Sequence, residues 1–376
     1  MPPVFAIASN IVSGLGMDTE AHWKAISQHK IAIQKFEDAA FSNTPFWASK
    51  LAPIQWQNID SQTRCSLPLS PFEQMASYSI KKALDELDEP IDLSKTAFIL
   101  STTKGNIELL GKTTDERLLL HHSAKQIASF IGIGGKPFVV SHACVSGIVA
   151  LQYGMRLLQS GRFKHAIVTG CDRFSKFVLN GFQSFQAISD EPCRPFDADR
   201  KGINLGEAAA TIVLSLYRNR ENDVLFVAGA TSNDANHISG PSRTGEELAM
   251  AINGAIKEAG ISPAQIDMIS AHGTATVYND EMESKAFELS GLLNAPVHSF
   301  KGYVGHTLGA AGVLESIVSI ESIKHQMLVP SLGYENLGVP KPIKVSEKFE
   351  PANLNYALKT ASGFGGCNAV IIWKKS

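Results

Sequence analysis

The sequence of 376 residues lacks the features that mark several common classes of protein. It holds only five cysteines, widely spaced and without a CxxC pair, which argues against a disulfide framework or a structural zinc site. It has no run of about 18 uncharged apolar residues, so no membrane-spanning helix is expected. The N-terminal segment has no basic region ahead of its short apolar stretch, so no signal peptide is expected either. These absences predict a cytoplasmic protein whose thiols stay reduced.

An excess of charge of one sign is also missing. The chain has 34 basic and 36 acidic residues, a formal net charge of -2, and no long charged run. A protein that binds nucleic acid or an anionic membrane usually carries a basic surface, so neither is expected as a partner. The glycine-rich segments match neither a P-loop nor a GxGxxG turn, which argues against a nucleotide site.

Short apolar runs typical of strands alternate with helical stretches along the chain. This alternation predicts an α/β protein with mixed sheets buried between helices. An apolar strand runs into a reactive side chain twice, at Cys144 and at His272, which hints at two similar halves. The most polar connection lies near residues 215–224, where the halves would join. The predicted strands include residues 96–100, 138–140, 166–168, 211–214, 268–270, 358–360 and 370–373.

Cys144 lies where a predicted strand gives way to a predicted helix. The strand covers residues 137–141, and apolar residues then recur with helical spacing from Ile148 to Leu158. The partial positive charge at a helix N-terminus favours thiolate, the nucleophilic form of cysteine. Position alone leaves a reactive thiol and a small buried apolar residue equally open. Three other cysteines are given the second interpretation: Cys65, Cys171 and Cys193.

Two histidines offer partners for this thiol, each on a glycine-rich segment after a predicted strand. His272 precedes a hydroxyl-rich loop, and His306 opens a helix rich in alanine and glycine. Glu315 lies in an apolar part of that helix, and a buried carboxylate needs a partner, for which Lys301 is the natural candidate. Other histidines are interpreted as core or surface residues: His121, His122, His165, His237 and His325.

One thiol and two imidazoles suit a particular chemistry. An acyl group would transfer to the thiol, and a decarboxylation would then create a carbon nucleophile. Two imidazoles can donate hydrogen bonds to the enolate oxygen that forms. This chemistry requires neither a metal nor an organic cofactor.

A glycine-rich turn, Gly363–Gly366, lies between two apolar strands near the C-terminus. It carries one aromatic residue, Phe364. Such flexibility fits a turn whose backbone N–H groups point at a developing oxyanion. An ordinary tight hairpin would explain the glycines equally well.

Taken together, these segments resemble the β-ketoacyl-acyl carrier protein synthases, the elongating condensing enzymes of the thiolase-like superfamily. The resemblance covers nearly the whole chain, and five motifs in the family's order carry it. They are SHACVSG around Cys144, RPFDADRKGINLGEAAA at 194–210, HGTATVYND at His272, KGYVGHTLGAAG with Lys301 and His306, and GFGGCNA at the glycine-rich turn.

The resemblance implies a thiolase-like, five-layered αβαβα fold with two similar halves. Residues 1–220 would carry the nucleophilic cysteine, and residues 221–376 both catalytic histidines. Cys144 would accept the acyl group. His272 and His306 would act in malonyl decarboxylation and stabilise the enolate.

The same resemblance implies roles for the surrounding residues. Lys301 would position His306 and interact with Asp280 and Glu315. The expected partner is an acyl carrier protein, whose phosphopantetheine arm delivers the substrate, so the enzyme would need no cofactor of its own. The assembly would be a homodimer, or a heterodimer with a subunit like a chain-length factor.

The resemblance also implies how substrate would be held. The backbone N–H groups of Cys144 and Phe364 would form an oxyanion hole, and the Phe364 ring would act as a gate. Three residues would contact the malonyl-phosphopantetheine end: Thr274, Thr276 and Gly365.

The chain departs from the family pattern beside these motifs. His142 and Val145 flank the nucleophile where small or hydroxylated residues are common. Cys367 stands where threonine is frequent, and Ser362 where an aromatic is common. The sequence also resembles condensing enzymes of specialised pathways, such as aryl polyene or other type II polyketide systems, so a fatty-acid and a polyketide pathway both stay open.

Two alternative functions stay open. A thiolase-type condensing enzyme that uses coenzyme A would need a second catalytic cysteine, for which Cys367 lies in the right region. A pocket-shaping subunit of a ketosynthase heterodimer would usually lack the nucleophile, which this chain has. Because an acyl carrier protein is acidic, a basic docking patch is expected on this chain. The candidates for that patch are Arg200, Lys201, Lys104 and Lys125.

Overall fold

The computed structural model describes residues 1–113, 116–235 and 240–376. Its main feature is one continuous sheet of eleven strands. In spatial order these are β13 (Lys344–Val345), β11 (Pro296–His298), β10 (Met268–Ser270), β15 (Tyr356–Gly363), β16 (Cys367–Lys374), β9 (Val224–Asn233), β1 (Phe5–Ser13), β8 (Ala208–Ser215), β6 (His165–Asp172), β4 (Thr96–Ser101) and β5 (Phe138–Val140). The strands expected from the sequence are therefore confirmed.

The sheet consists of two halves that repeat one topology. In the N-terminal half, β5, β4 and β6 are parallel, and β8 and β1 follow antiparallel. In the C-terminal half, β11, β10 and β15 are parallel, and β16 and β9 follow antiparallel. The halves meet where β1 pairs with β9, at Ala6 and Val224. The division at residue 220 stays a prediction, since the two halves share this sheet.

The repeat has a different register from the one expected from the sequence. By position in the sheet, the counterpart of β10 is β4, and the counterpart of β5 is β11. The strand before Cys144 therefore corresponds to the strand before Lys301, rather than to the strand before His272. Both strand-to-site transitions look alike in sequence because both follow short, apolar parallel strands.

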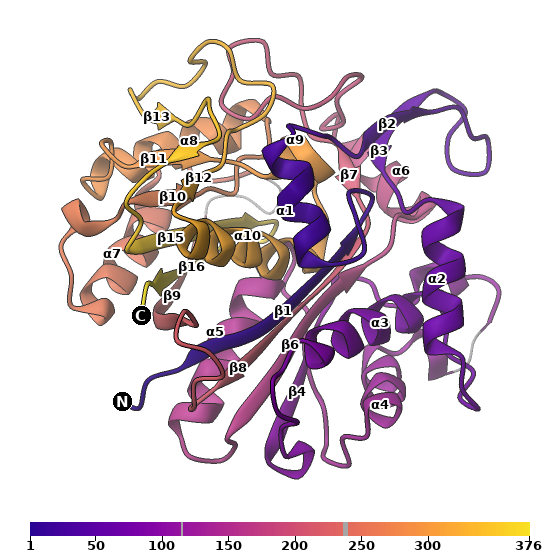
Figure 1. The fold of residues 1–376 in the computed structure, drawn as a ribbon. Coiled ribbons are helices and arrows are strands. Elements are labelled where there is room, and N and C mark those ends of the chain that lie inside the picture. Colours follow the sequence, from indigo (N-terminus) through magenta and orange to yellow (C-terminus); the bar gives the residue numbers. More distant parts are fainter. Residues whose placement is uncertain (114–115, 236–239) are drawn as a thin grey trace.

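Helices cover and separate the two half-sheets (Figure 1). The inner layer is α5 (Ser146–Gln159) and α10 (Ala311–His325), whose apolar side chains form one core with both half-sheets. One outer layer is α3 (Pro71–Asp85) and α4 (Leu120–Ile131), packed on the N-terminal half-sheet. The other is α7 (Glu246–Ala259) and α8 (Val277–Leu289), packed on the C-terminal half-sheet. Helices and half-sheets together make the five αβαβα layers that the resemblance implied.

Shorter elements surround these layers. A small sheet joins β2 (Ile33–Phe36), β3 (Phe46–Ser49) and β7 (Leu205–Gly206), and a second pairs β12 (Met327–Leu328) with β14 (Glu350–Pro351). The remaining α-helices of the described residues are α1 (Thr19–Ser27), α2 (Pro53–Thr63), α6 (Lys176–Ser184) and α9 (Lys301–Val304), and one of the short 3₁₀ turns, η5 (Leu308–Ala310), directly precedes α10. Among the residues described, no helix has both the length and the apolar character needed to cross a bilayer.

Candidate active site

Cys144 lies on a sharp turn between β5 and α5. The preceding residue, Ala143, has a φ of +45°, a left-handed conformation that costs a residue with a side chain about 1 kcal/mol or more. Ser146 stabilises this turn, because its hydroxyl accepts a hydrogen bond from the His142 N–H at 2.7 Å and donates one to the Ala143 carbonyl at 2.6 Å. The turn therefore presents Cys144 just before the first residue of α5.

Two glycines bring the N-terminal ends of α5 and α10 together. A Cβ on Gly147 would lie 2.8 Å from the Val313 nitrogen, and a Cβ on Gly312 would lie 2.6 Å from the Ile148 nitrogen. The helices thus approach backbone to backbone, which only glycine permits at these positions. The contact carries Cys144 toward His306, which lies shortly before α10.

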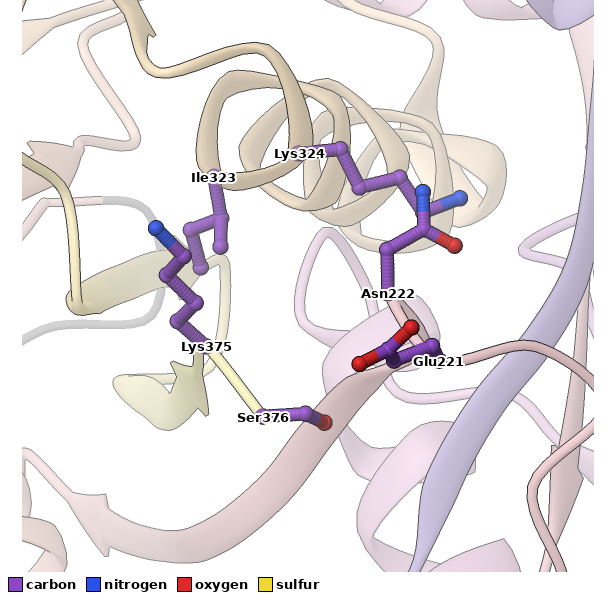
Figure 2. A pocket seen from close by; sticks show the side chains of 6 residues that line it. All are labelled: Glu221, Asn222, Ile323, Lys324, Lys375 and Ser376. Carbon is purple, nitrogen blue, oxygen red and sulfur yellow. The ribbon is translucent and has the colours of Figure 1, made fainter.

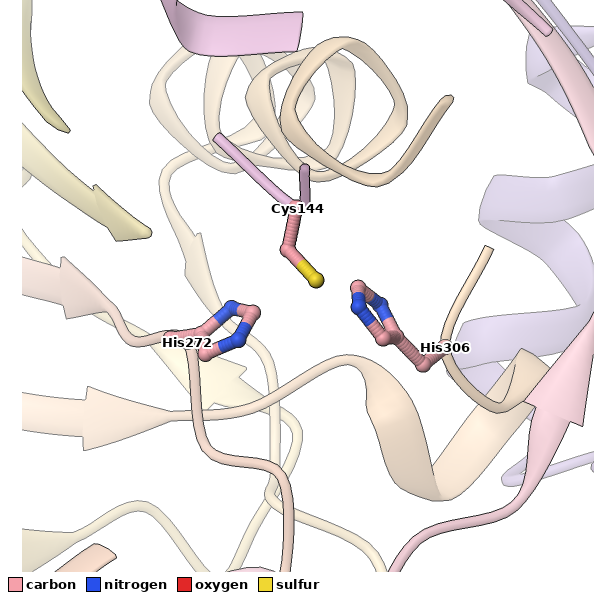
Figure 3. A group of neighbouring side chains, drawn as sticks. All are labelled: Cys144, His272 and His306. Atoms are coloured by element: carbon pink, nitrogen blue, oxygen red, sulfur yellow. The ribbon is translucent and has the colours of Figure 1, made fainter. Parts of the chain in front are cut away.

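The thiol and the two predicted histidines converge (Figure 3). One ligand atom of each of Cys144, His272 and His306 lies within 4.8 Å of the others, and all three residues are buried. The imidazole centroids are 5.3 Å apart, and the ring planes make an angle of 85°. The sulfur points between the two rings, so one bound substrate could contact all three groups.

His306 is held through its backbone by the central segment of the chain. Its N–H donates to the Asn204 carbonyl at 2.7 Å, and its carbonyl accepts from the Gly206 N–H at 2.9 Å. Asn204 and Gly206 belong to the segment 194–210 that contributed to the family resemblance. Part of that motif therefore serves to position a histidine.

His272 is held by a residue that sequence reasoning missed, Glu283 on α8. One carboxylate oxygen accepts from the His272 N–H at 2.8 Å, and the other accepts from the Gly273 N–H at 2.6 Å. The Thr360 hydroxyl also accepts from the His272 N–H, at 3.1 Å, and donates to Glu283 at 2.8 Å. The signal was available, because an acid three residues after Asp280 lies on the same helix face.

Lys301 makes the predicted ion pair with Glu315 but does not interact with Asp280 as predicted. Its Nζ lies 2.7 Å from Glu315 Oε1 and donates to the His272 carbonyl at 2.6 Å. The bond to the His272 carbonyl links Lys301 to His272, whereas the family resemblance implied that Lys301 positions His306.

Asp280 has different partners because it faces the segment around residue 196. Its carboxylate accepts from the Phe196 N–H at 2.8 Å and lies 3.8 Å from Arg200 Nε. Burial, together with the nearby Glu283 carboxylate, raises the pKa of Asp280 to about 7. Asp280 thus binds the segment that contains Phe196 and Arg200, rather than pairing with the Lys301 ammonium group.

Both imidazoles are neutral at physiological pH. Burial lowers the pKa of His272 and of His306 well below the usual value, and the Lys301 and Lys359 ammonium groups lower both further. A neutral imidazole carries one N–H donor and one acceptor nitrogen. In the described structure, Nδ1 of His272 and both ring nitrogens of His306 have no hydrogen-bond partner, so they are available to a substrate.

The Cys144 thiol is protonated in the free site, contrary to the expectation from the helix N-terminus. Burial raises its pKa to about 11, although the Lys301 and Lys104 ammonium groups oppose this shift. Removing the thiolate from water therefore outweighs the stabilisation that these ammonium groups give it. The thiol must lose its proton as it reacts, and a neutral imidazole beside it can accept that proton.

This protonation state predicts how alkylation of Cys144 depends on pH. The rate of modification by iodoacetamide should rise about tenfold per pH unit from about pH 7 to about pH 10, because only the thiolate reacts. Peptide mass spectrometry distinguishes Cys144 from the other cysteines. A rate that levels off below about pH 8 would show instead that the site stabilises the thiolate.

The glycine-rich turn between β15 and β16 lies against the nucleophile. A Cβ on Gly363 would lie 3.0 Å from the Cys144 nitrogen, and the Phe364 backbone N–H lowers the pKa of the Cys144 thiol. Gly366 has a φ of +76°, and a Cβ there would lie 1.9 Å from the Asp234 carbonyl oxygen. The turn thus needs its glycines, and it brings the Phe364 N–H beside Cys144, as an oxyanion hole requires.

The Phe364 ring lies in an aromatic cluster at the surface. Its centroid is 5.6 Å from that of Phe182 and 5.3 Å from that of Phe185, and 37% of Phe364 is exposed. A ring in this position can move without disturbing the core. Its role as a gate stays a prediction.

Cys367 does not belong to the group formed by Cys144 and the two histidines. Its sulfur lies 2.7 Å from His142 Nε2 and 3.8 Å from the Phe364 carbonyl oxygen. Two departures from the family pattern thus contact each other beneath the glycine-rich turn. The second catalytic cysteine that a thiolase needs is not supplied by Cys367 in this arrangement.

The other predicted substrate contacts follow His272 in the chain or lie in the glycine-rich turn. The hydroxyls of Thr274 and Thr276 are 2.8 Å apart just after His272, and Gly365 is exposed in the turn. Ser362 donates to Asn368 at 2.7 Å, and Val145 is buried in the core. The substrate roles of the threonines and of Gly365 stay predictions.

The docking candidates separate into buried and exposed residues. Arg200 is wrong as a docking residue, because it is buried and donates to the carbonyls of Asp197 and Gly338. Lys104 is partly buried, and its ammonium charge lowers the pKa of the Cys144 thiol. The two exposed candidates are Lys125 and Lys201.

A shallow hollow of about 400 Å³ lies away from this site (Figure 2). Its lining includes residues at the C-terminal end of α10, whereas His306 precedes the N-terminal end of that helix. A helix of this length spans about 20 Å, so the hollow and His306 lie at opposite ends of it. Its lining residues are Glu221, Asn222, Ile323, Lys324, Lys375 and Ser376. None of these residues belongs to the group formed by Cys144, His272 and His306. His237, named above among the non-catalytic histidines, lies outside the described residues.

Comparison with known families gives two matches that together cover well over half of the chain. Residues 95–219 match the β-ketoacyl synthase N-terminal domain, and residues 224–335 match the β-ketoacyl synthase C-terminal domain. The first match contains Cys144, and the second contains His272 and His306.

Individual relatives extend over nearly the whole chain. The chain is 27% identical over 414 residues to 3-oxoacyl-[acyl-carrier-protein] synthase 2 of Vibrio cholerae, covering 97% of this chain and 98% of that protein. The ketosynthase (ApeO) in complex with its chain length factor (ApeC) from Xenorhabdus doucetiae has a TM-score of 0.85 at 23% identity, covering 100% of this chain and 98% of that one. The type II PKS acyl-carrier protein in complex with its ketosynthase bound to the hexaketide (AntDE:AntF) has a TM-score of 0.86 at 22% identity, covering 100% of this chain and 99% of that one.

Proposed function

Because the chain belongs to the β-ketoacyl synthase family, we propose that it is a 3-oxoacyl-[acyl carrier protein] synthase. It joins an acyl group held on Cys144 to a malonyl group on an acyl carrier protein, in fatty-acid or type II polyketide elongation. One observation supports this proposal above the others: the Cys144 sulfur points between two buried, neutral imidazoles that separate networks hold in place. A pocket-shaping subunit would not need this group.

In the first half-reaction, the Cys144 sulfur attacks the thioester carbonyl of an acyl carrier protein. A new sulfur–carbon bond forms, and the bond to the phosphopantetheine sulfur breaks. The proton of the thiol passes to a neutral imidazole and then to the departing thiolate. The N–H groups of Cys144 and Phe364 stabilise the negative oxygen of the intermediate, as their proximity allows.

In the second half-reaction, the malonyl carboxylate leaves as carbon dioxide. The electron pair of the broken carbon–carbon bond becomes the enolate of the remaining thioester. N–H donors of His272 and His306 stabilise its oxygen in a site that excludes water. The enolate carbon then attacks the acyl carbonyl on Cys144, and the sulfur leaves as a thiolate and regains a proton.

The reaction needs no cofactor on the enzyme. The phosphopantetheine arm arrives with the carrier protein, and Thr274, Thr276 and Gly365 receive its malonyl end. Lys125 and Lys201 stay candidates for docking the acidic carrier. The activity belongs in the cytoplasm, where reducing conditions keep Cys144 free.

The test is a two-step assay on the purified chain, alone and with a ketosynthase-like partner. Incubation with an acyl carrier protein loaded with an acyl group should add the acyl mass to the Cys144 peptide. Malonyl carrier protein should then remove this mass and release carbon dioxide and a β-ketoacyl product. Condensation of acetyl-coenzyme A without any malonyl donor would favour a thiolase and contradict the proposal.

We also propose that the protein acts as a dimer through β5. This strand forms the edge of the eleven-stranded sheet, and its three residues are only partly buried. An edge strand with unpaired backbone groups invites pairing with another chain. The occupant would be a second copy, or a chain-length-factor-like subunit such as the one that accompanies the Xenorhabdus ketosynthase.

Sedimentation equilibrium measures this assembly directly. The expected result is about twice the chain mass, either for the chain alone or after mixing with the partner subunit. A monomer under both conditions, at a concentration where condensation is measurable, would contradict the dimer. The same experiment distinguishes the homodimer from the heterodimer.

A further inference from the structure

A second lysine is buried beside the site, Lys359 in the middle of β15. It is fully buried, and β15 lies between β10 and β16 in the centre of the C-terminal half-sheet. A buried ammonium group is costly unless its charge is paired and its N–H groups are bonded. A lysine here therefore needs a specific set of partners, which the described structure supplies.

Lys359 shares the Glu315 carboxylate with Lys301. Its Nζ lies 2.5 Å from Glu315 Oε2, whereas the Lys301 Nζ lies 2.7 Å from Oε1. Lys359 also donates to the carbonyls of Ala271, at 3.1 Å, and Thr360, at 2.7 Å, and it lies 3.3 Å from the Ser270 carbonyl. Lys359 thus contacts the Ser270 and Ala271 carbonyls, and Lys301 binds the His272 carbonyl. Together the two lysines hold three successive carbonyls.

The charge of this cluster also acts on the imidazoles. Lys301, Lys359 and Glu315 carry a formal charge of +1 among themselves, and the Glu283 carboxylate, which binds the His272 N–H, balances it. The two ammonium groups are among the causes that lower the pKa of His272 and of His306. The other titratable groups around the cluster are Cys144, Glu283 and His298.

We propose that Lys359 is a positioning residue of the condensing reaction: it fixes the strand end that presents His272, and it adds a positive charge beside the Glu315 carboxylate, close to both imidazoles. This inference rests on the proposed function. Lys359 does not touch the substrate, so it acts through His272, His306 and Glu315. Lys359 is the one charged residue in the segment Ala357–Ala361 of β15.

The test compares Lys359→Met with Glu315→Gln and with both changes together. Lys359→Met should lower the condensation kcat about tenfold or more, while single-turnover acylation of Cys144 stays within about threefold. The acid limb of condensation should move to higher pH in Lys359→Met, because one positive charge is lost and protonation of the imidazoles becomes easier. It should move to lower pH in Glu315→Gln, which loses one negative charge, and return toward the wild-type position in the double variant, whose net charge equals that of wild type.

Lys344→Met, on an exposed strand-end lysine, is the matched control and should leave both steps unchanged. Histidine ¹⁵N NMR of His272 and His306 provides a second readout that does not depend on activity and applies even if only Glu315→Gln folds. Acid limbs and imidazole titrations that are the same in all folded variants would overturn the inference. A wild-type chain that does not condense would overturn the proposed function, while the NMR comparison still decides the role of Lys359.

Discussion

Replacing Cys144 with alanine is expected to abolish condensation and leave the fold intact. The sulfur points into the site between two imidazoles, and acyl transfer has no other nucleophile within that group (Figure 3). The loss should be about 10³-fold or more in kcat/KM, since a covalent intermediate can no longer form. The stability cost should be about 1 kcal/mol, because one buried sulfur atom is removed and the backbone turn is unchanged.

Intact-mass measurement checks this result directly. The wild-type chain should gain the acyl mass and the Cys144→Ala variant should not. The variant should still release carbon dioxide from malonyl carrier protein, because His272 and His306 remain in place. Cys367→Ala is the matched control, since it removes a neighbouring buried thiol that lies outside the catalytic group, and it should condense within about threefold of wild type. Condensation by Cys144→Ala at the wild-type rate would contradict the role of the thiol.

The local structure around Cys144 could be predicted from the sequence because several signals coincide there. A strand, a sharp turn and a helix start each leave a pattern in a few neighbouring residues, and the structure contains all three. What the sequence could not supply was the protonation state. The pKa of the thiol depends on how completely distant segments bury it, and that burial raises the pKa to about 11. A dipole argument uses only the local helix and takes no account of this burial.

The residues that sequence reasoning missed share a property. Glu283 and Lys359 both bind backbone groups of the loop that follows β10, so their function depends on tertiary contacts. A charged residue within an apolar run is a usable signal, and Lys359 showed it. Arg200 was misassigned for the converse reason, since a basic residue in a polar segment looks exposed until its carbonyl partners are known.

His272→Ala and His306→Ala are expected to separate the two half-reactions. Each variant should lower condensation about 10²-fold to 10⁴-fold, because an N–H donor to the enolate oxygen is lost from a site without competing water. Cys144 should still become acylated in at least one of them, since the remaining imidazole can accept the thiol proton. Release of carbon dioxide from malonyl carrier protein and the acyl mass on Cys144 measure the two steps independently.

The two variants should not behave identically, because different networks hold the two rings. His272 is tied to Glu283, Thr360 and Lys301, whereas His306 is tied to residues 204–206. His325→Ala is the matched control, since that imidazole stacks on Trp23 at the far end of α10 and should leave both steps unchanged. Undiminished decarboxylation in both catalytic variants would place the enolate elsewhere. Decarboxylation lost in both, with acylation kept, would show that both imidazoles act on the same enolate oxygen.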